Sequence, residues 1–305
     1  MKLRFNDMQQ SQPDPFIFAD GEHFYLYATG KDGVTVFESK TLADEWLYRG
    51  IATDFENASE FWAPSVIRLE GKYYMYVSCI SEAGHQFMHV AVSDAPIGPF
   101  KKVACLYDHF SIDSHMVKTD AGLFLFYAKN NVDCDLVGTR IYIDRFLDPV
   151  TPEYNPKEVL LPSFPEEKYS STTPPKGDWY TLEGPFWFRE GDWQYLMYSG
   201  GRYKNDTYHL GYAVAKTDEQ DLKKVDFVKV TDHGRFSPLL IKNDFEEGTG
   251  HNSVIKYQNE YYIFYHARDY QDQLEQEYVE RRTARICRMT VRDGVLTAER
   301  FEDRL

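Results

Sequence analysis

The chain has 305 residues, of which 43% are hydrophobic and 16% aromatic, and its formal net charge is −14. The hydrophobic fraction is large enough to form a core, which excludes a wholly disordered chain. The negative charge repels nucleic acid and anionic membranes, so neither is expected as a partner. The 23 Tyr and 21 Phe favour pleated strands over helices and also suit contact with the apolar faces of sugars.

Five segments share one pattern, in which an apolar strand is followed by a short turn and an aromatic-rich strand. In chain order they are 14–30, 62–78, 113–129, 183–200 and 251–268. Turns such as ADGEH, LEGK and REGD predict β-hairpins. The copies begin roughly 50 to 70 residues apart, and each interval holds one further strand pair, for example 88–94 or 208–216. The pattern predicts an all-β fold, specifically a five-bladed β-propeller with four antiparallel strands per blade.

The domain organisation follows from the same repeat. We expect a single catalytic domain over residues 1–305, with the proline-rich stretch 149–180 as an inserted loop and the last blade formed from its own four strands. No run of 18 apolar residues occurs, which predicts no transmembrane helix. No apolar signal-peptide segment follows the N-terminus, which predicts a cytoplasmic location.

The residues that open the five repeats are the main functional clue. They are Asp14, Trp62, Asp113, Glu183 and His251. Equivalent positions of a propeller surround its central axis, so three carboxylates are expected at one mouth, although charged residues are rarely buried without partners. Such a set suits hydrolysis of a glycosidic bond, which needs one protonated and one ionised carboxyl group whose pKa values are held apart. A divalent-cation site or a structural hydrogen-bond network is the alternative that these residues leave open.

Five motifs, each in phase with a repeat, resemble those of glycoside hydrolase family 43 across nearly the whole chain. They are DP at 14–15, WAPSV at 62–66, SIDSH at 111–115, EGPF at 183–186 and GTGHNS at 248–253. The resemblance implies an inverting glycoside hydrolase in which Asp14 is the general base and Glu183 the general acid. Asp113 would modulate the pKa of Glu183 and orient it. The chemistry would require no cofactor.

The resemblance also implies a place for His251. The matching histidine of the family lies in the central channel near a bound cation, often calcium. The alternative is a hydrogen-bonded axial histidine without a metal.

Four further residues are candidates for substrate binding, each with a structural alternative. Trp62 is expected to form a wall of the sugar pocket rather than part of the core. Arg285 resembles a late arginine of the family that contacts substrate hydroxyls, and a surface salt bridge is its alternative. His115 shares a strand face with Asp113 but could equally be a buried, hydrogen-bonded histidine, and Phe186, the last residue of the EGPF motif, is a weaker candidate.

The expected substrate is an arabino- or xylo-oligosaccharide, because the family acts mostly on α-L-arabinofuranosyl and β-D-xylosyl linkages of plant cell-wall polysaccharides. The chain lacks the C-terminal β-sandwich common in the xylosidase branch, which favours an exo-acting α-L-arabinofuranosidase. A β-D-xylosidase or an endo-arabinanase or xylanase is the alternative within the family. A non-catalytic sugar-binding propeller is the alternative from another class.

Overall fold

The described part of the chain consists of strands joined by turns and loops. The structure is a computed structural model that describes residues 1–7, 10–81, 84–171, 177–270 and 280–301. Two short 3₁₀ helices, Pro165–Glu167 and Leu222–Lys224, are present, and these ranges contain no α-helix. The all-β expectation is therefore confirmed. None of the helices in these ranges has the length and apolar character needed to cross a bilayer.

The strands pair into four sheets. The first sheet contains β1 (Phe16–Asp20), β2 (His23–Ala28), β3 (Thr35–Ser39) and β4 (Leu47–Ile51). The second contains β6 (Ser59–Leu69), β7 (Lys72–Ile80), β8 (Gln86–Ser93), β9 (Phe100–Cys105) and the short β5 (Thr53–Asp54). The last contains β20 (Glu246–Tyr257), β21 (Glu260–Asp269), β22 (Thr283–Arg292) and β23 (Val295–Arg300).

The remaining sheet has ten strands in two groups. One group contains β10 (Ser111–Thr119), β11 (Gly122–Asn131), β12 (Gly138–Asp148), β13 (Thr151–Pro152) and β14 (Lys157–Leu160). The other contains β15 (Lys168–Ser171), β16 (Asp178–Glu190), β17 (Trp193–Gly200), β18 (His209–Lys216) and β19 (Val228–Lys229). The groups are joined by a short parallel ladder at Gly138 and Thr139 of β12. A Cβ on Gly138 would lie 1.8 Å from the carbonyl oxygen of Tyr180, so glycine permits this close approach.

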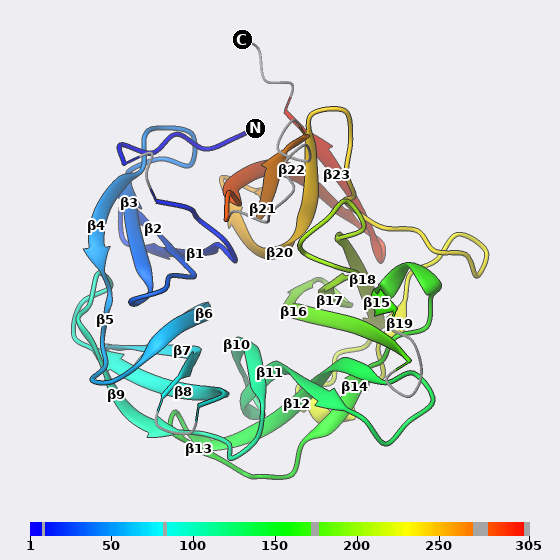
Figure 1. Ribbon diagram of the computed structural model, residues 1–305, viewed down its shortest axis with the longest axis horizontal. Coiled ribbons are helices and arrows are strands. Elements are labelled where there is room, and N and C mark those ends of the chain that lie inside the picture. Colours follow the sequence, from blue (N-terminus) through cyan, green and yellow to red (C-terminus); the bar gives the residue numbers. More distant parts are fainter. Residues whose placement is uncertain (8–9, 82–83, 172–176, 271–279, 302–305) are drawn as a thin grey trace.

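The first strands of the five antiparallel hairpins surround the centre of the molecule (Figure 1). Strand β1 contacts β6 and β20, while β10 contacts β6 and β16, and β16 contacts β20. These contacts close a ring of five inner strands, and the other strands of each sheet lie outward from it (Figure 1).

The hairpin turns follow the sequence prediction. Two-residue loops connect β1 to β2, β6 to β7 and β16 to β17. In the second of these, Glu70 and Gly71 have φ angles of 50° and 83°. Positive φ at both loop positions is characteristic of the type I′ turn, whose twist matches that of the strands.

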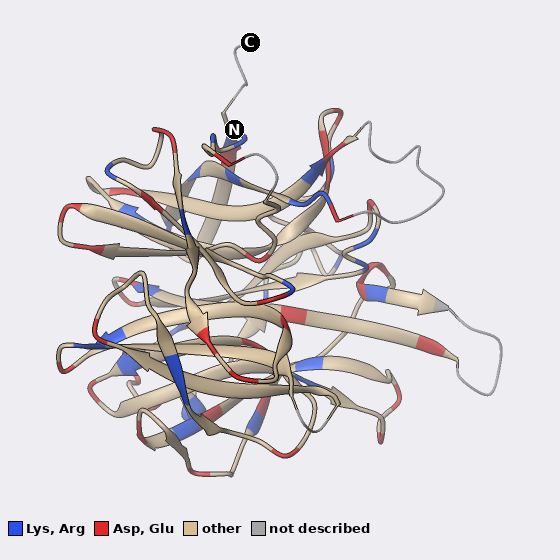
Figure 2. Cartoon of the chain, turned by 60° about the vertical axis from the view of Figure 1, so that its left-hand side comes forward, with Lys and Arg blue, Asp and Glu red and all other residues tan. Residues whose placement is uncertain are grey.

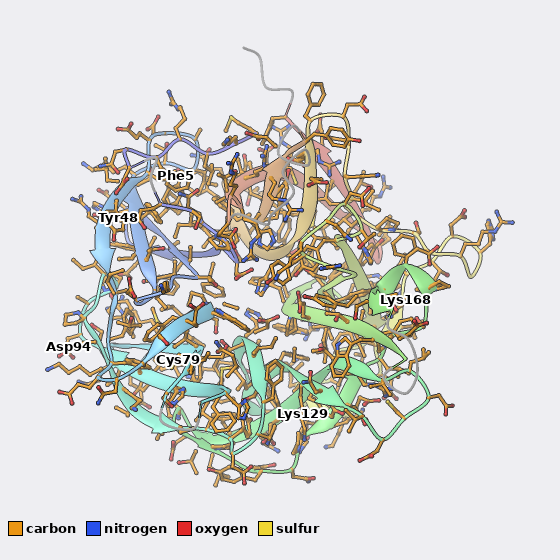
Figure 3. The ribbon with its side chains drawn as sticks, in the orientation of Figure 1. Phe5, Tyr48, Cys79, Asp94, Lys129 and Lys168 are labelled. Atoms are coloured by element: carbon orange, nitrogen blue, oxygen red, sulfur yellow. The ribbon has the colours of Figure 1, made fainter. Side chains whose placement is uncertain are left out.

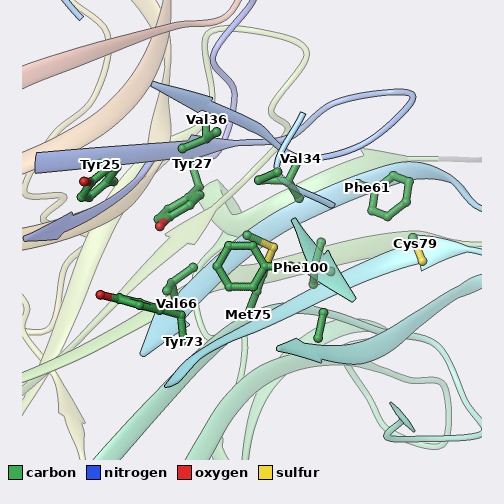
Figure 4. Packing of buried hydrophobic residues seen from close by; sticks show 13 residues of the cluster. Tyr25, Tyr27, Val34, Val36, Phe61, Val66, Tyr73, Met75, Cys79 and Phe100 are labelled. Atoms are coloured by element: carbon green, nitrogen blue, oxygen red, sulfur yellow. The ribbon is translucent and has the colours of Figure 1, made fainter. Parts of the chain in front are cut away.

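The hydrophobic cores lie between neighbouring strand groups. Figure 4 shows one of them, in which Tyr25 and Tyr27 of β2 pack against Met75 of β7 and Phe100 of β9. Another joins Tyr76 of the second sheet to aromatic and aliphatic residues of the β10–β12 group. Burial of apolar surface between groups therefore holds the ring together. Acidic and basic residues are interspersed over the loops and strands (Figure 2).

The N-terminal segment links the first sheet to the last. The backbones of Met1 and Leu3 hydrogen-bond to Ile286 and Ala284 of β22. A few residues later Phe5 forms a parallel bridge with Trp46, next to β4. The last sheet therefore has its own four strands, as expected, and additionally receives the N-terminal segment along β22.

We expect Phe5→Ala to destabilise the protein by about 3–5 kcal/mol, because Phe5 is 6% exposed and its phenyl group packs edge-on against Phe37, with centroids 4.8 Å apart. Phe5 is labelled in Figure 3, on the N-terminal segment. The measurement is the free energy of unfolding in urea. Phe245→Ala is the matched control, because Phe245 is 78% exposed. Equal effects of the two substitutions would show that the N-terminal segment does not stabilise the closed ring of strand groups.

Candidate active site

Each inner strand has a left-handed residue at the same distance from its hairpin turn, and β6 and β20 have a second one at Glu60 and Gly248. The shared left-handed residue lies six positions before the last inner-strand residue that pairs across the hairpin turn. In chain order these residues are Asp14, Ala63, Asp113, Gly184 and His251, with φ angles of 54°, 47°, 60°, 59° and 48°. In the four longer inner strands, the pairing register shifts around this residue. Such β-bulges re-aim side chains and are common beside active sites. The repeat thus bends all five inner strands at one level.

The positions of the left-handed residues differ in two repeats from the residues predicted to surround the axis. Asp14, Asp113 and His251 are the left-handed residues, as the repeat predicts. Trp62 and Glu183 each lie one position earlier, before Ala63 and Gly184. Sequence alignment of the motifs was therefore one residue out of register in two of the five repeats, because the bend position is not tied to one residue type.

The bend frees backbone N–H groups, and side chains from the preceding strand group accept them. The backbone N–H of Asp14 donates to Nδ1 of His266 at 3.0 Å, and the backbone N–H of His251 donates to Oγ of Ser199 at 2.7 Å. The amide of Ala63 donates to Oγ1 of Thr29 at 2.8 Å. Since a buried unpaired N–H is costly, these bonds stabilise the bends and tie adjacent strand groups together.

The three predicted carboxylates meet in one pocket of about 470 Å³. Asp14, Asp113 and Glu183 all line it, together with His251 and Trp62. Asp14 and Asp113 are 8% and 5% exposed, so both are largely shielded from solvent. The pocket is also lined by charged and polar residues outside the motifs, including Lys31, Glu60, Tyr203, Glu280 and Arg282.

Asp14 lies next to one guanidinium group, that of Arg282. Its Oδ1 accepts a hydrogen bond from Arg282 at 3.2 Å, and its Oδ2 accepts one from Thr29 at 2.5 Å. Burial alone would raise the pKa of Asp14, but the charge of Arg282, with contributions from His251 and His266, holds that pKa well below its ordinary value. Asp14 is therefore ionised over the whole neutral range.

Glu183 and Asp113 have the opposite electrostatic environment. Burial raises the pKa of Glu183 to about 7, although a 2.7 Å hydrogen bond from the Tyr208 hydroxyl opposes the increase. Burial and the neighbouring charges of Glu183 and Asp14 raise the pKa of Asp113 well above its ordinary value. Asp113 also accepts the backbone N–H of Gly184 at 2.9 Å. Because these two acids titrate together, the pair retains a proton near neutral pH.

His251 lies between two of the carboxylates. Its Nδ1 is 3.3 Å from Oδ1 of Asp14 and 3.9 Å from Oδ2 of Asp113. Among the residues that the structure describes, no group of three or more His, Cys, Asp and Glu side chains is spaced to hold a metal ion. These residues do not fit direct coordination of calcium, which takes six to eight oxygen ligands. Calcium near His251 stays a prediction, and no chemical step here depends on it.

Of the four predicted substrate-binding residues, the structure places Trp62 at the pocket and the other three elsewhere. Arg285 forms ion pairs with Glu246 at 3.3 Å and Asp269 at 2.5 Å, so its guanidinium is engaged within the last sheet. His115 stacks on Phe186 with ring centroids 4.1 Å apart, and its Nε2 is 3.0 Å from the carbonyl oxygen of Trp187. These two rings pack against each other and do not line the pocket.

Sequence reasoning missed four residues whose side chains contact the carboxylates: Thr29, Arg282, Tyr208 and His266. Arg282 lies three positions before Arg285 and directly precedes β22, so it is not part of the strand that contains Arg285. The sequence shows both arginines but not where the strand begins. Tyr208 and His266 occupy no motif position, and nothing in the sequence pattern distinguishes them from the many aromatic core residues.

A pocket that combines an ionised carboxylate with a proton-holding carboxyl pair is typical of enzymes that cleave glycosidic bonds. The family described as Glycosyl hydrolases family 43 matches residues 8–296. The chain belongs to this family of inverting glycoside hydrolases, and the family prediction is confirmed.

Relatives and solved structures agree with this assignment. The extracellular exo-alpha-(1->5)-L-arabinofuranosidase ArbA of Cellvibrio japonicus is 24% identical, over 83% of this chain and 78% of that protein. The structure of a thermostable family-43 glycoside hydrolase is 30% identical, with a TM-score of 0.81 and coverage of 95% of this chain and 93% of that one. An endo-1,4-beta-xylanase of Bacteroides thetaiotaomicron shares the fold, with 24% identity, a TM-score of 0.73 and 94% coverage of both chains.

The expected cytoplasmic location is contradicted by these comparisons. The Cellvibrio japonicus relative is described as extracellular. The absence of an apolar N-terminal segment was therefore an unsound basis for assigning a compartment.

We expect Glu183→Gln to stabilise the protein progressively as the pH rises from about 4 to 7. A carboxyl whose pKa is raised by folding contributes stability that is present below its unfolded pKa, about 4.3, and is lost as pH rises through its folded pKa, about 7. Glutamine cannot ionise, so the variant should gain roughly 1–3 kcal/mol relative to wild type between pH 4 and 8. Urea unfolding at several pH values measures the difference.

The control for this experiment is Glu190→Gln, at a carboxyl outside the pocket. Hydrogen bonds from Tyr261 and Lys256 lower the pKa of Glu190, so its substitution should give the opposite trend with pH. A stability difference for Glu183→Gln that does not change with pH would contradict the raised pKa.

Proposed function

We propose that this protein is an inverting, exo-acting α-L-arabinofuranosidase that removes arabinose from short arabino-oligosaccharides. The observation that carries the proposal is the opposite displacement of two pKa values in one pocket, low for Asp14 and high for Glu183. The exo-arabinofuranosidase named among the relatives supports the substrate class.

In this proposal Asp14 is the general base. An ionised carboxylate can take a proton from a water molecule as that water attacks the anomeric carbon. The charge of Arg282 and the hydrogen bond from Thr29 favour this ionised form and fix its orientation. Holding the base in one position lowers the entropic cost of reaching the reactive geometry.

Glu183 is the general acid. Its pKa of about 7 keeps a proton available at neutral pH for the oxygen of the departing sugar. Asp113 supports it in two ways: its carboxyl group shares the proton equilibrium, and its hydrogen bond from Gly184 fixes the backbone directly after Glu183.

We further propose that the sheets form a five-bladed propeller within one catalytic domain spanning residues 1–305. The closed ring of five inner strands and the five repeated bends support this assignment. The ten-stranded sheet would then be two blades that are joined by the short ladder between β12 and β16.

A β-D-xylosidase or an endo-acting enzyme of the same family is the second candidate, and a non-catalytic sugar-binding protein is the candidate from another class. Comparison of 4-nitrophenyl α-L-arabinofuranoside with the matching β-D-xyloside distinguishes the two sugars. Linear arabinan distinguishes release of single arabinose units from release of longer fragments.

We expect Asp14→Asn and Glu183→Gln each to reduce kcat/KM by about 10²–10⁴-fold, because each removes one partner of the acid–base pair. Asp144→Asn is a matched control, since Asp144 is buried but lies outside the pocket-lining residues. Proton NMR of the earliest product should show β-L-arabinose from an α-linked substrate. Early release of the α anomer would contradict inversion, and equal activity of both variants and wild type would contradict catalysis at this pocket.

We expect Arg282→Gln to move the acidic limb of the kcat/KM profile to higher pH. The base must be ionised, and Arg282 is the largest influence that lowers the pKa of Asp14, so its removal raises that pKa. Arg285→Gln is the control, because Arg285 pairs with two carboxylates, Glu246 and Asp269, outside the pocket. An acidic limb that moves equally in both variants would show that Arg282 does not act through Asp14.

A further inference from the structure

Tyr208 links the two sides of the pocket although no motif contains it. It lies directly before β18, is 1% exposed, and donates its hydroxyl proton to Oε1 of Glu183 at 2.7 Å. Its ring stacks on His266, with centroids 5.6 Å apart and planes 5° from parallel. His266 in turn accepts the backbone N–H of Asp14. One buried aromatic stack therefore connects the residue proposed as acid with the backbone of the residue proposed as base.

The surrounding backbone is shaped to hold the Tyr208 ring. A Cβ on Gly250 would lie 2.0 Å from Cε1 of Tyr208, so a glycine is required where β20 passes the ring. The hydroxyl is also held in its protonated form, because burial and the charges of Glu183, Asp14 and Asp113 raise the pKa of Tyr208 well above its ordinary value. Tyr208 therefore acts on Glu183 as a fixed hydrogen-bond donor.

We infer that Tyr208 is the positioning residue of the general acid: it occupies Oε1 of Glu183, leaves Oε2 to carry the transferable proton, and stabilises the carboxylate that forms when the proton leaves. This inference rests on the proposed role of Glu183. In the step, the Oε2 proton passes to the glycosidic oxygen as the bond to the anomeric carbon breaks. Glu183 becomes a carboxylate, and Tyr208 keeps its own proton while donating a hydrogen bond to the new charge.

This role is distinct from that of the other groups around Glu183. The described residues whose charges or dipoles act on Glu183, or are acted on by it, come from every neighbouring strand group; they are Asp14, Asp113, Tyr169, Tyr208 and Arg282. Of these, Tyr208 and Arg282 favour the ionised form, and Tyr208 does so by direct hydrogen bonding. The hydrogen bond from Tyr208 thus keeps the pKa of Glu183 lower than burial alone would make it, so that Glu183 can release its proton as well as hold it.

Tyr208→Phe removes the hydroxyl and keeps the ring. We expect the alkaline limb of the kcat/KM profile to move to higher pH, because Glu183 loses a donor to its ionised form. On an alkyl arabinofuranoside or arabinobiose, whose leaving group needs a proton, kcat/KM should fall roughly tenfold to a hundredfold. On 2,4-dinitrophenyl α-L-arabinofuranoside the loss should be much smaller, since that leaving group departs without protonation.

The matched control is Tyr265→Phe. Tyr265 is fully buried and donates to a glutamate, Glu246, at 2.9 Å, but lies outside the pocket lining. It should leave the alkaline limb and the ratio between the two substrates unchanged. Equal losses on both substrates, an unmoved alkaline limb, or the same behaviour in Tyr265→Phe would overturn the inference.

A measurement without substrate separates this inference from the proposed function. In protein labelled with ¹³C at the glutamate carboxyl, the Glu183 signal is assigned by its loss in Glu183→Gln and titrated in wild type and Tyr208→Phe. The Glu183 pKa should be higher in the variant, and an unchanged value overturns the inference even if the enzyme is active. Conversely, inactive wild-type protein with a shifted titration would overturn the proposed function alone. Gly250→Ala, which displaces the ring while keeping the hydroxyl, should shift the pKa in the same direction and serves if Tyr208→Phe does not fold.

Discussion

The structure depends on one repeated bend, at which each inner strand adopts a left-handed backbone. For residues other than glycine this conformation costs roughly 1–2 kcal/mol, so it persists only where the surroundings offset it. Here the offset comes from the neighbouring strand group, whose side chains accept the freed backbone N–H of Asp14, Ala63 and His251. The same bonds that relieve the bend therefore couple adjacent groups, and the site forms only where the ring closes.

The bends bring acids together, and one cation then separates their functions. Arg282 approaches Asp14 at 3.2 Å, within the pocket, while Glu183 is bound by the neutral hydroxyl of Tyr208. An ion pair favours the charged carboxylate strongly, whereas one neutral hydrogen bond does not overcome burial. Two chemically similar groups in one cavity thus receive different proton affinities, which is the requirement for acid–base catalysis on a single bond.

The sequence predicted what depends on pattern and missed what depends on contacts. Alternation and turn residues predicted the hairpins, and the repeat brought Asp14, Asp113 and Glu183 into a single pocket. The bend itself falls on Asp, Ala, Gly or His, so no residue type marks it, and Trp62 and Glu183 were aligned one position off. The choice between Arg282 and Arg285 needed the start of a strand. The join between β12 and β16 depends on Gly138, whose role emerges only when Tyr180 is beside it.

An exception in the ring explains why Asp113 and Glu183 interact. The acceptors Ser199 and His266 each pair with the residue before a bend, and the equivalent position in the third group, opposite Ile112, is Ala128. The alanine side chain has no hydrogen-bond acceptor, and the N–H of Gly184 donates instead to the carboxylate of Asp113 at 2.9 Å. That bond holds the Asp113 side chain beside the strand that carries Glu183, where the charge of Glu183 raises the pKa of Asp113. The presence of alanine at position 128 of β11 is thus part of the reason why Asp113 lies close to Glu183.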